Sequence, residues 1–168
     1  MEPQVAADDG ARRARRRLGS ARRRAATRVL IVDDDPAMRL LCAVNLELEG
    51  LVVLEASDGR HGLVRARVER PDLILTDVTM PILDGFELVE ALRRDWRTRR
   101  IPFVFLSGES TAANRARAEK LGALGYVTKP FDPLRLGAVV VDALALARDR
   151  RRARRWTRRR RGSTRPAA

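Results

Sequence analysis

Short apolar runs alternate with longer amphipathic segments through the middle of the chain. The runs recur at intervals of about 20 to 25 residues, as repeated βα units do. They span residues 29–32, 52–54, 73–75, 103–106 and 126–127. Because they are continuously apolar rather than alternating, both faces of each strand are expected to be covered. The pattern predicts an α/β fold with a five-stranded parallel sheet and helices on both of its faces.

The segments between these runs carry helical spacing and helix-end signals. Pro36 stands near the start of the first helix, Asp84 and Ser110 are expected to cap the third and fourth, and Gly122 to end the fourth. The last helix is expected to begin after Pro133. One face of the first helix is expected to hold Met38, Leu41, Asn45 and Leu48.

Polar side chains follow the predicted strands at the point where each strand ends. They are Asp33, Asp34 and Asp35 after the first strand, Asp77 after the third, Ser107 after the fourth and Lys129 after the fifth. In open parallel sheets the functional crevice lies beyond these carboxyl ends. Converging carboxylates repel one another unless a cation neutralises them, and an all-oxygen site suits Mg²⁺. With an ammonium and a hydroxyl at the same edge, the group predicts phosphoryl transfer to a carboxylate nucleophile, Asp77.

Four motifs carry a family resemblance. VDDDP, LILTDVTMP, FLSGE and GYVTKPF occur in this order, with 43, 30 and 22 residues separating Asp34, Asp77, Ser107 and Lys129. Together they resemble the receiver domain of two-component response regulators (CheY-like) over residues 28–147. The resemblance implies a (βα)5 doubly wound, three-layer sandwich of the flavodoxin/CheY-like type.

The resemblance also implies the chemistry of the site. Asp77 would be the phosphoacceptor, receiving its phosphoryl group from a sensor histidine kinase or a phosphotransfer protein. Asp34 and Asp77 would bind Mg²⁺ directly, Asp33 mainly through water, and Thr79 through its backbone carbonyl. The protein would then be a phosphoacceptor of a signalling relay rather than an enzyme acting on a separate substrate.

A switch follows from the same resemblance. Ser107 would donate a hydrogen bond to the phosphoryl group, Lys129 would pair with it, and Tyr126 would move into the space that Ser107 leaves. The peptide bond between Lys129 and Pro130 would be cis. The switched surface would bind a downstream effector that the sequence does not name, in a receiver that acts on its own.

Two other protein classes share parts of this pattern. Phosphatases of the haloacid dehalogenase type also use an aspartate nucleophile with Mg²⁺, but their acid/base carboxylate stands two residues further on, where this chain has Thr79. A flavodoxin-like FMN protein would have the same fold, but a crevice lined with carboxylates would repel the FMN phosphate.

Charge is distributed unevenly in this chain of net charge +13. Residues 1–27 hold eight arginines and three acidic residues, and residues 148–168 hold eleven arginines and one acidic residue, Asp149. Both arms are expected to be disordered, unless the last helix extends past residue 147 into the second arm. An alternative function is nucleic-acid binding through these arms. The candidate residues are Arg154, Arg155, Trp156, Arg158 and Arg159.

The single cysteine, Cys42, is expected to be a small core residue in a reducing compartment. The first thirty residues lack the apolar stretch of a secretory signal, and no apolar run approaches the length of about 20 residues that spans a bilayer. The sequence therefore predicts a cytoplasmic protein without membrane insertion.

Overall fold

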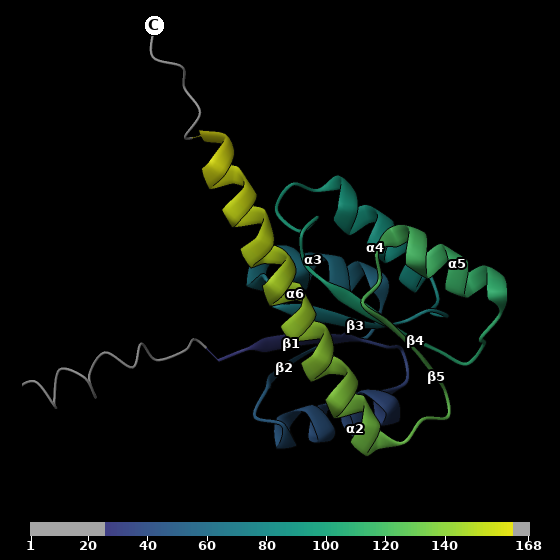
Figure 1. Cartoon of the computed structure of the whole chain (residues 1–168). Coiled ribbons are helices and arrows are strands. Elements are labelled where there is room, and N and C mark those ends of the chain that lie inside the picture. The colour runs from purple at the N-terminus through teal and green to yellow at the C-terminus, as the bar shows by residue number, and fades with distance from the viewer. Residues whose placement is uncertain (1–25, 163–168) are drawn as a thin grey trace, which may run out of the picture.

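The computed structural model describes residues 26–162, apart from the side chains of Arg155 and of residues 158–162. Strands and helices alternate along this part of the chain, as the apolar pattern predicts (Figure 1). In order they are β1 (Arg28–Val32), α2 (Pro36–Leu48), β2 (Val52–Ala56), α3 (Gly59–Glu69), β3 (Leu73–Asp77), α4 (Gly85–Arg94), β4 (Phe103–Ser107), α5 (Ala112–Leu121), β5 (Gly125–Thr128) and α6 (Pro133–Gly162).

The five strands form one parallel sheet in the order β2-β1-β3-β4-β5. This is a doubly wound order, in which the succession of strands along the sheet changes direction between β1 and β3, so the predicted fold class is confirmed. β3 and β4 are buried along their whole length and β1 nearly so, whereas the edge strands β2 and β5 are half-buried. The expectation that both faces of every strand are covered is therefore correct for the three inner strands only.

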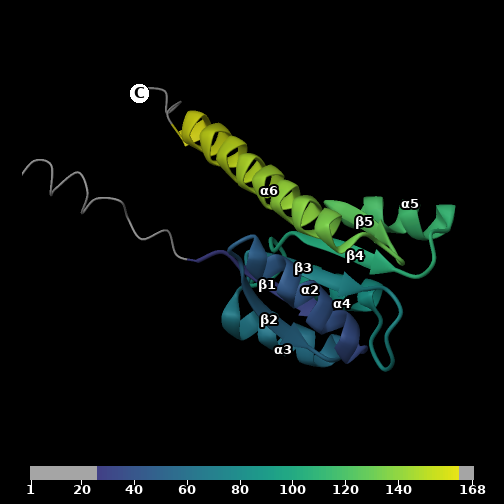
Figure 2. The same ribbon diagram turned by 90° about the horizontal axis from the view of Figure 1, so that it is seen from below.

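Alternate residues of the strands face two separate apolar clusters, because successive side chains of a strand point to opposite sides. Leu30 and Val32 of β1 belong to a cluster built with α3, α4 and α5. Val29 and Ile31 belong to a second cluster built with α2 and α6. The sheet is therefore the middle layer of three, with α2 below it and α3 and α5 above it in Figure 1. Figure 2 shows the molecule from below, on the side of α2.

Local signals define most helix ends. The Asp84 carboxylate caps α4 in a capping box, and Gly122 ends α5 with φ 80°. The N-cap of α5 is Thr111 rather than Ser110. The Thr111 hydroxyl accepts from a backbone N–H of the first turn, whereas the Ser110 hydroxyl accepts a hydrogen bond of 2.7 Å from Arg115 Nε. The predicted cap was therefore wrong by one residue.

The inner face of α2 differs from the predicted one. Cys42, Ala43 and Leu46 are buried, whereas Leu41 is 39% exposed and Leu48 is 78% exposed. Helix α2 packs against both β1 and α6. Its smaller side chains occupy this double contact, and two of the large leucines that the sequence suggested for the core lie outside it.

Helix α6 continues far beyond the sheet. Leu136, Val140 and Leu144 anchor its first half in the second cluster. Its later part enters the arginine-rich segment and remains helical to Gly162, as a projection visible in Figure 1. The predicted disorder of the arms lies outside the described residues for 1–25 and 163–168.

The described part of the chain includes no helix whose length and apolar content would let it cross a membrane.

Candidate functional site

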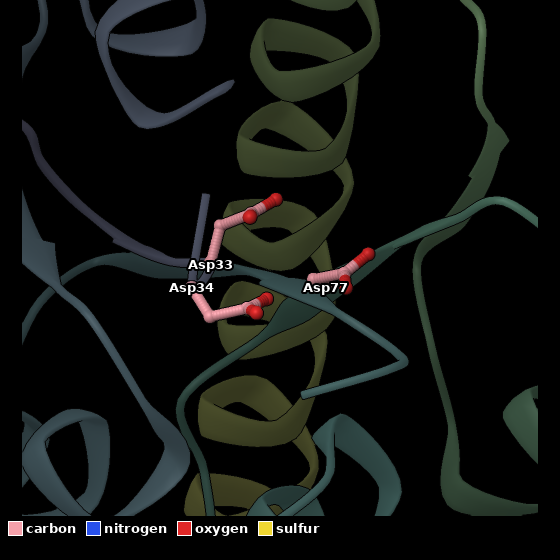
Figure 3. Close-up of side chains that lie close together, drawn as sticks. All are labelled: Asp33, Asp34 and Asp77. Atoms are coloured by element: carbon pink, nitrogen blue, oxygen red, sulfur yellow. The ribbon is translucent and has the colours of Figure 1, made fainter. Parts of the chain in front are cut away.

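The site is assembled by the register of neighbouring strands. Val32 at the end of β1 pairs with Thr76 of β3, so the next residues of the two strands, Asp33 and Asp77, stand at the same level. Asp34 follows in the loop after β1. Figure 3 shows the three carboxylates gathered at this edge. The prediction that strand-end acids meet is correct for these three residues.

Lys129 lies directly after β5 and reaches across the edge to two of these acids. Its Nζ is 2.8 Å from Asp33 Oδ2 and 2.9 Å from Asp77 Oδ1. Asp33 is 1% exposed and Asp77 is 5% exposed, so the ion pairs lie largely out of water. The Lys129–Pro130 peptide bond is cis, as the resemblance implied. One ammonium thus compensates two buried carboxylates that come from different strands.

Backbone groups and a nearby arginine hold the loop after β1. The Asp35 N–H donates to Asp33 Oδ1 at 2.9 Å. Arg39 Nη1 donates to the carbonyl oxygens of Asp33 at 2.8 Å and of Asp34 at 3.3 Å. Sequence reasoning did not identify Arg39. Its only signal is a cation in the first turns of the helix that follows the acidic loop.

Gly85 allows the first turn of α4 to approach the backbone of Asp77 closely. A Cβ atom at this position would lie 2.0 Å from the Asp77 carbonyl oxygen, so no larger residue fits without movement of the backbone. The Gly85 N–H also donates to the Val78 carbonyl at 2.9 Å. Sequence reasoning missed this contact, although the Asp84-Gly85 dipeptide marks the turn.

The electrostatics of the site follow from burial. Burial raises the pKa of the Asp77 carboxyl, against the lowering effect of the Lys129 hydrogen bond and charge. Burial alone would lower the pKa of Lys129, but its hydrogen bonds to Asp33 and Asp77 outweigh burial and raise it. Asp77 is thus a poorly hydrated carboxylate with a cation beside it, and further positive charge would stabilise its ionised form.

The donor set fits a hard divalent cation. One carboxylate oxygen from each of Asp33, Asp34 and Asp77 can be chosen so that all three lie within 4.8 Å of one another. Asp34 is exposed and the other two are buried, which leaves an open side for water and substrate oxygens. Oxygen ligands from two or three carboxylates, completed by water, match the preference of Mg²⁺. Thr79 is exposed in the loop after β3, two residues beyond Asp77.

The two predicted switch residues meet at a third residue that was not predicted to link them. The Ser107 hydroxyl donates to the Glu109 carbonyl at 2.7 Å and accepts from the Glu109 N–H at 3.0 Å. The Tyr126 hydroxyl donates to the same carbonyl at 2.7 Å. In this structure Ser107 is therefore engaged with the loop after β4, and both hydroxyls share the Glu109 carbonyl oxygen.

The candidate nucleic-acid residues lie on α6, away from this site. Arg154 and Trp156 are exposed on the projecting part of the helix, beyond the end of the sheet opposite to the carboxylates. The side chains of Arg155, Arg158 and Arg159 are outside the described set. The structure therefore separates these residues from Asp77 and Lys129.

Comparison with known proteins finds a matching family model and similar sequences. The family model of the response regulator receiver domain matches residues 29–141. The "DNA-binding dual master transcriptional regulator RpaA" of Synechocystis is 43% identical over 100 residues, which cover 60% of this chain and 42% of that protein. Protein PilH of Pseudomonas aeruginosa is 37% identical over 100 residues, which cover 60% of this chain and 83% of PilH.

Solved structures show the same likeness. The chemotaxis protein CheY4 of Vibrio cholerae superposes with a TM-score of 0.65 at 32% identity, covering 73% of this chain and 99% of that one. The chain spans less than half the length of some curated relatives, such as RpaA and PhoP of Bacillus subtilis, at 42% and 44%. The family model matches most of the folded domain, and the acidic edge of the sheet is present. The chain therefore belongs to the family of response regulator receiver domains.

Proposed function

We propose that the protein accepts a phosphoryl group on Asp77 in a Mg²⁺-dependent phosphorelay. The donor would be a phosphohistidine of a sensor histidine kinase or of a phosphotransfer protein. The observation that carries the proposal is the position of the Asp77 carboxylate, 2.9 Å from Lys129 Nζ and grouped with Asp33 and Asp34 at the open edge of the sheet. Family membership supports the same chemistry.

In the proposed reaction an oxygen of Asp77 attacks the phosphorus atom of the phosphohistidine. The new O–P bond forms as the N–P bond breaks, and the imidazole nitrogen keeps the electron pair. Lys129 offers its ammonium to the negative charge on the equatorial phosphoryl oxygens. Asp34 and Asp77 directly, Asp33 through water and Thr79 through its carbonyl would hold Mg²⁺. When bound, the ion neutralises charge on the phosphoryl group and brings it into line with the carboxylate.

The proposed output is a change at the loop after β4. After phosphorylation, the Ser107 hydroxyl would donate to a phosphoryl oxygen and would leave the Glu109 carbonyl that it shares with Tyr126. Losing one of two donors shifts the balance between the orientations of the Tyr126 side chain. A downstream effector that prefers one orientation would then bind with a different affinity.

The phosphatase alternative has less support. Such an enzyme needs a carboxylate acid/base two residues beyond its nucleophile, and Thr79 carries a hydroxyl at that position. A threonine hydroxyl does not deprotonate near neutral pH, so it is a poor replacement for a general base. We therefore assign Asp77 the role of a phosphoacceptor within signalling rather than that of an enzyme nucleophile.

Incubation with acetyl phosphate tests the proposal. We expect intact-mass analysis to show one added phosphoryl group on the wild-type protein in the presence of Mg²⁺ and none after Mg²⁺ is chelated. Asp77→Asn should remove the adduct. Asp142→Asn, an exposed aspartate of α6, is the matched control and should keep it. An adduct of equal yield on Asp77→Asn, or none on the wild type, would contradict the proposal.

A further inference from the structure

The projecting part of α6, residues 148–162, is the feature that phosphoryl chemistry leaves unexplained. Arg150, Arg151, Arg152 and Arg154 are all exposed there. Successive residues of a helix are about 100° apart, so these four positions spread positive charge over an arc of about 200° around the helix axis. The remaining arc includes Asp149, Ala153 and Trp156, so one large apolar side chain of the described projection stands on it.

Repulsion between the positive charges of this projection destabilises its helix. Arg150 and Arg154 stand four residues apart, and the same spacing relates other arginines of the segment. Like charges at this spacing destabilise an isolated helix. Asp149 is the only acidic residue that the sequence places after residue 147. A polyanion would relieve this repulsion by placing negative charge beside the exposed arginines.

We propose that the α6 projection binds the phosphate backbone of duplex DNA, with its helix lying in the major groove. An α-helix with side chains is about 10 to 12 Å wide, and the major groove of B-DNA is about 12 Å wide. The fifteen residues 148–162 extend about 22 Å at 1.5 Å per residue, which is long enough to follow the groove across several base pairs. Arginines over an arc of about 200° of the helix can reach phosphates on both walls of the groove.

The chemistry of the projection favours DNA over the other polyanions. A helix that lies on an anionic membrane buries an apolar face. Trp156 is the one large apolar residue of the described projection. In A-form RNA the major groove is too deep and narrow for side chains to read. Phosphate contacts need only cations at the spacing of the backbone, and arginine supplies these.

The position of the projection allows DNA and the phosphoryl donor to bind together. Helix α6 starts beside β5 at the edge that carries Asp77 and runs back along the sheet. Arg148 Nη2 contacts Thr27 Oγ1 at 3.0 Å, just before β1 begins, which marks the opposite edge. The sequence before Thr27 holds eight more arginines, so both arginine-rich segments join the domain at this edge. DNA held there stays away from the carboxylates that would repel it.

Fluorescence anisotropy with a labelled duplex of about 20 random base pairs tests the proposal across about 50 to 200 mM salt. The test variant is Arg150→Gln/Arg151→Gln/Arg152→Gln/Arg154→Gln in the full chain, since glutamine keeps helix propensity. The matched control makes the same change at four exposed arginines of the domain. These are Arg60, Arg70, Arg99 and Arg100.

We expect the wild type to bind with an affinity that falls steeply with salt. The α6 variant should lose on the order of tenfold or more in affinity, with a shallower salt slope, because each lost phosphate contact removes about 0.9 from that slope. The domain control should bind like the wild type. Equal losses in the two variants would reduce the effect to net charge and overturn the proposal, as would absence of DNA binding by the wild type.

Two further measurements separate the sources of binding. The first measures binding of the protein to phosphatidylserine vesicles and, separately, to poly-glutamate, each at the same charge concentration as the duplex. Tighter binding to either one than to the duplex would overturn the assignment to DNA. In Trp96→Phe, Trp156 is the only tryptophan left, and DNA should change its fluorescence. Asp77→Asn should bind DNA like the wild type, so failure of the phosphoacceptor role would not imitate failure here.

Discussion

The two ends of the molecule treat charge in opposite ways. At the carboxyl edge, Lys129 lies within 2.9 Å of two carboxylates, and these groups are held in position by the strand ends. On the α6 projection, Arg150, Arg151, Arg152 and Arg154 are exposed, and the sequence of the projection offers them one acidic residue, Asp149. Buried charges must be compensated within the fold because burial without a partner is costly. Exposed charges are stabilised by water, so they can remain unpaired within the fold and bind a partner outside the protein.

Helix α6 contains both a buried apolar half and an exposed charged half. Leu136 and Val140 of α6 are buried in the second apolar cluster, whereas Arg150 and Arg154 of the same helix are exposed. The backbone conformation is the same in both halves, and only the side chains differ. Helix formation alone therefore says little about what a segment contributes, and packing and charge compensation distinguish the two halves.

The largest contrast should appear in the accessibility of thiols. Cys42 is 0% exposed, and burial raises its pKa from 9.0 to about 12, with the charge of Asp33 adding to this. Its neutral thiol should react with a thiol reagent at pH 8 on the order of a thousandfold more slowly in the native protein than in denaturant, since reaction requires opening of the core. Absorbance of the released reporter group gives the rate.

The same reagent applied to Ala153→Cys completes this comparison. Residue 153 is exposed on the projection, so we expect one thiol to react at the rate of a free cysteine while Cys42 stays protected. Two fast thiols, or none, would mean that the projection and the core do not differ in the way described.

The next largest effect should come from Lys129→Met. The substitution leaves Asp33 and Asp77 buried without their cation, and removing one partner of a buried pair costs about 3 kcal/mol of unfolding free energy. Urea unfolding at neutral pH measures this loss. Lys120→Met is the matched control, since Lys120 is the only other lysine of the chain and is exposed on α5. A loss at Lys129 no greater than that at Lys120 would show that water, rather than Lys129, compensates the carboxylates.

The smallest effect should come from reversing one charge on the projection. Arg150→Glu replaces repulsion of Arg154 with an i,i+4 pair, which stabilises a helix by about 0.5 kcal/mol at low salt. Far-UV circular dichroism should show increased helicity, and the gain should shrink as salt screens the pair. Arg150→Gln, which removes the repulsion without adding attraction, should give an intermediate value. Equal helicity in all three proteins would mean that charge does not limit this helix.

The sequence was most informative where topology alone decides the outcome. Once five apolar runs predict a parallel sheet, every residue that follows a strand comes to one edge. Asp33, Asp77 and Lys129 are therefore brought to that edge, where their side chains form the ion pairs. For the last helix the sequence left two outcomes open, a disordered arm from residue 148 or a helix that continues into it, and the structure shows a helix as far as Gly162.

The sequence was least informative where a contact depends on side-chain packing. The prediction grouped Leu41 and Leu48 on one face because of their helical spacing, but the helix packs through Cys42, Ala43 and Leu46. The Arg39 side chain donates to a backbone carbonyl oxygen, and Glu109 accepts through its own backbone carbonyl oxygen. Backbone acceptors do not appear in a pattern of residue types. Such contacts require the distance between two chain segments, and residue spacing does not supply it.

The continuity of α6 has a mechanical consequence. Leu136 and Leu144 anchor the first half of the helix in the core, and Arg148 contacts Thr27 before the helix extends to Gly162. The base of the helix is therefore held by the domain, and its tip lies beyond the sheet. A tilt of about 5° at the base displaces a tip about 22 Å away by about 2 Å, given a rise of 1.5 Å per residue. Small adjustments beside β5, where α6 begins, would thus be magnified at the far end of the molecule. A pair of distance labels on the domain and the tip would read them directly.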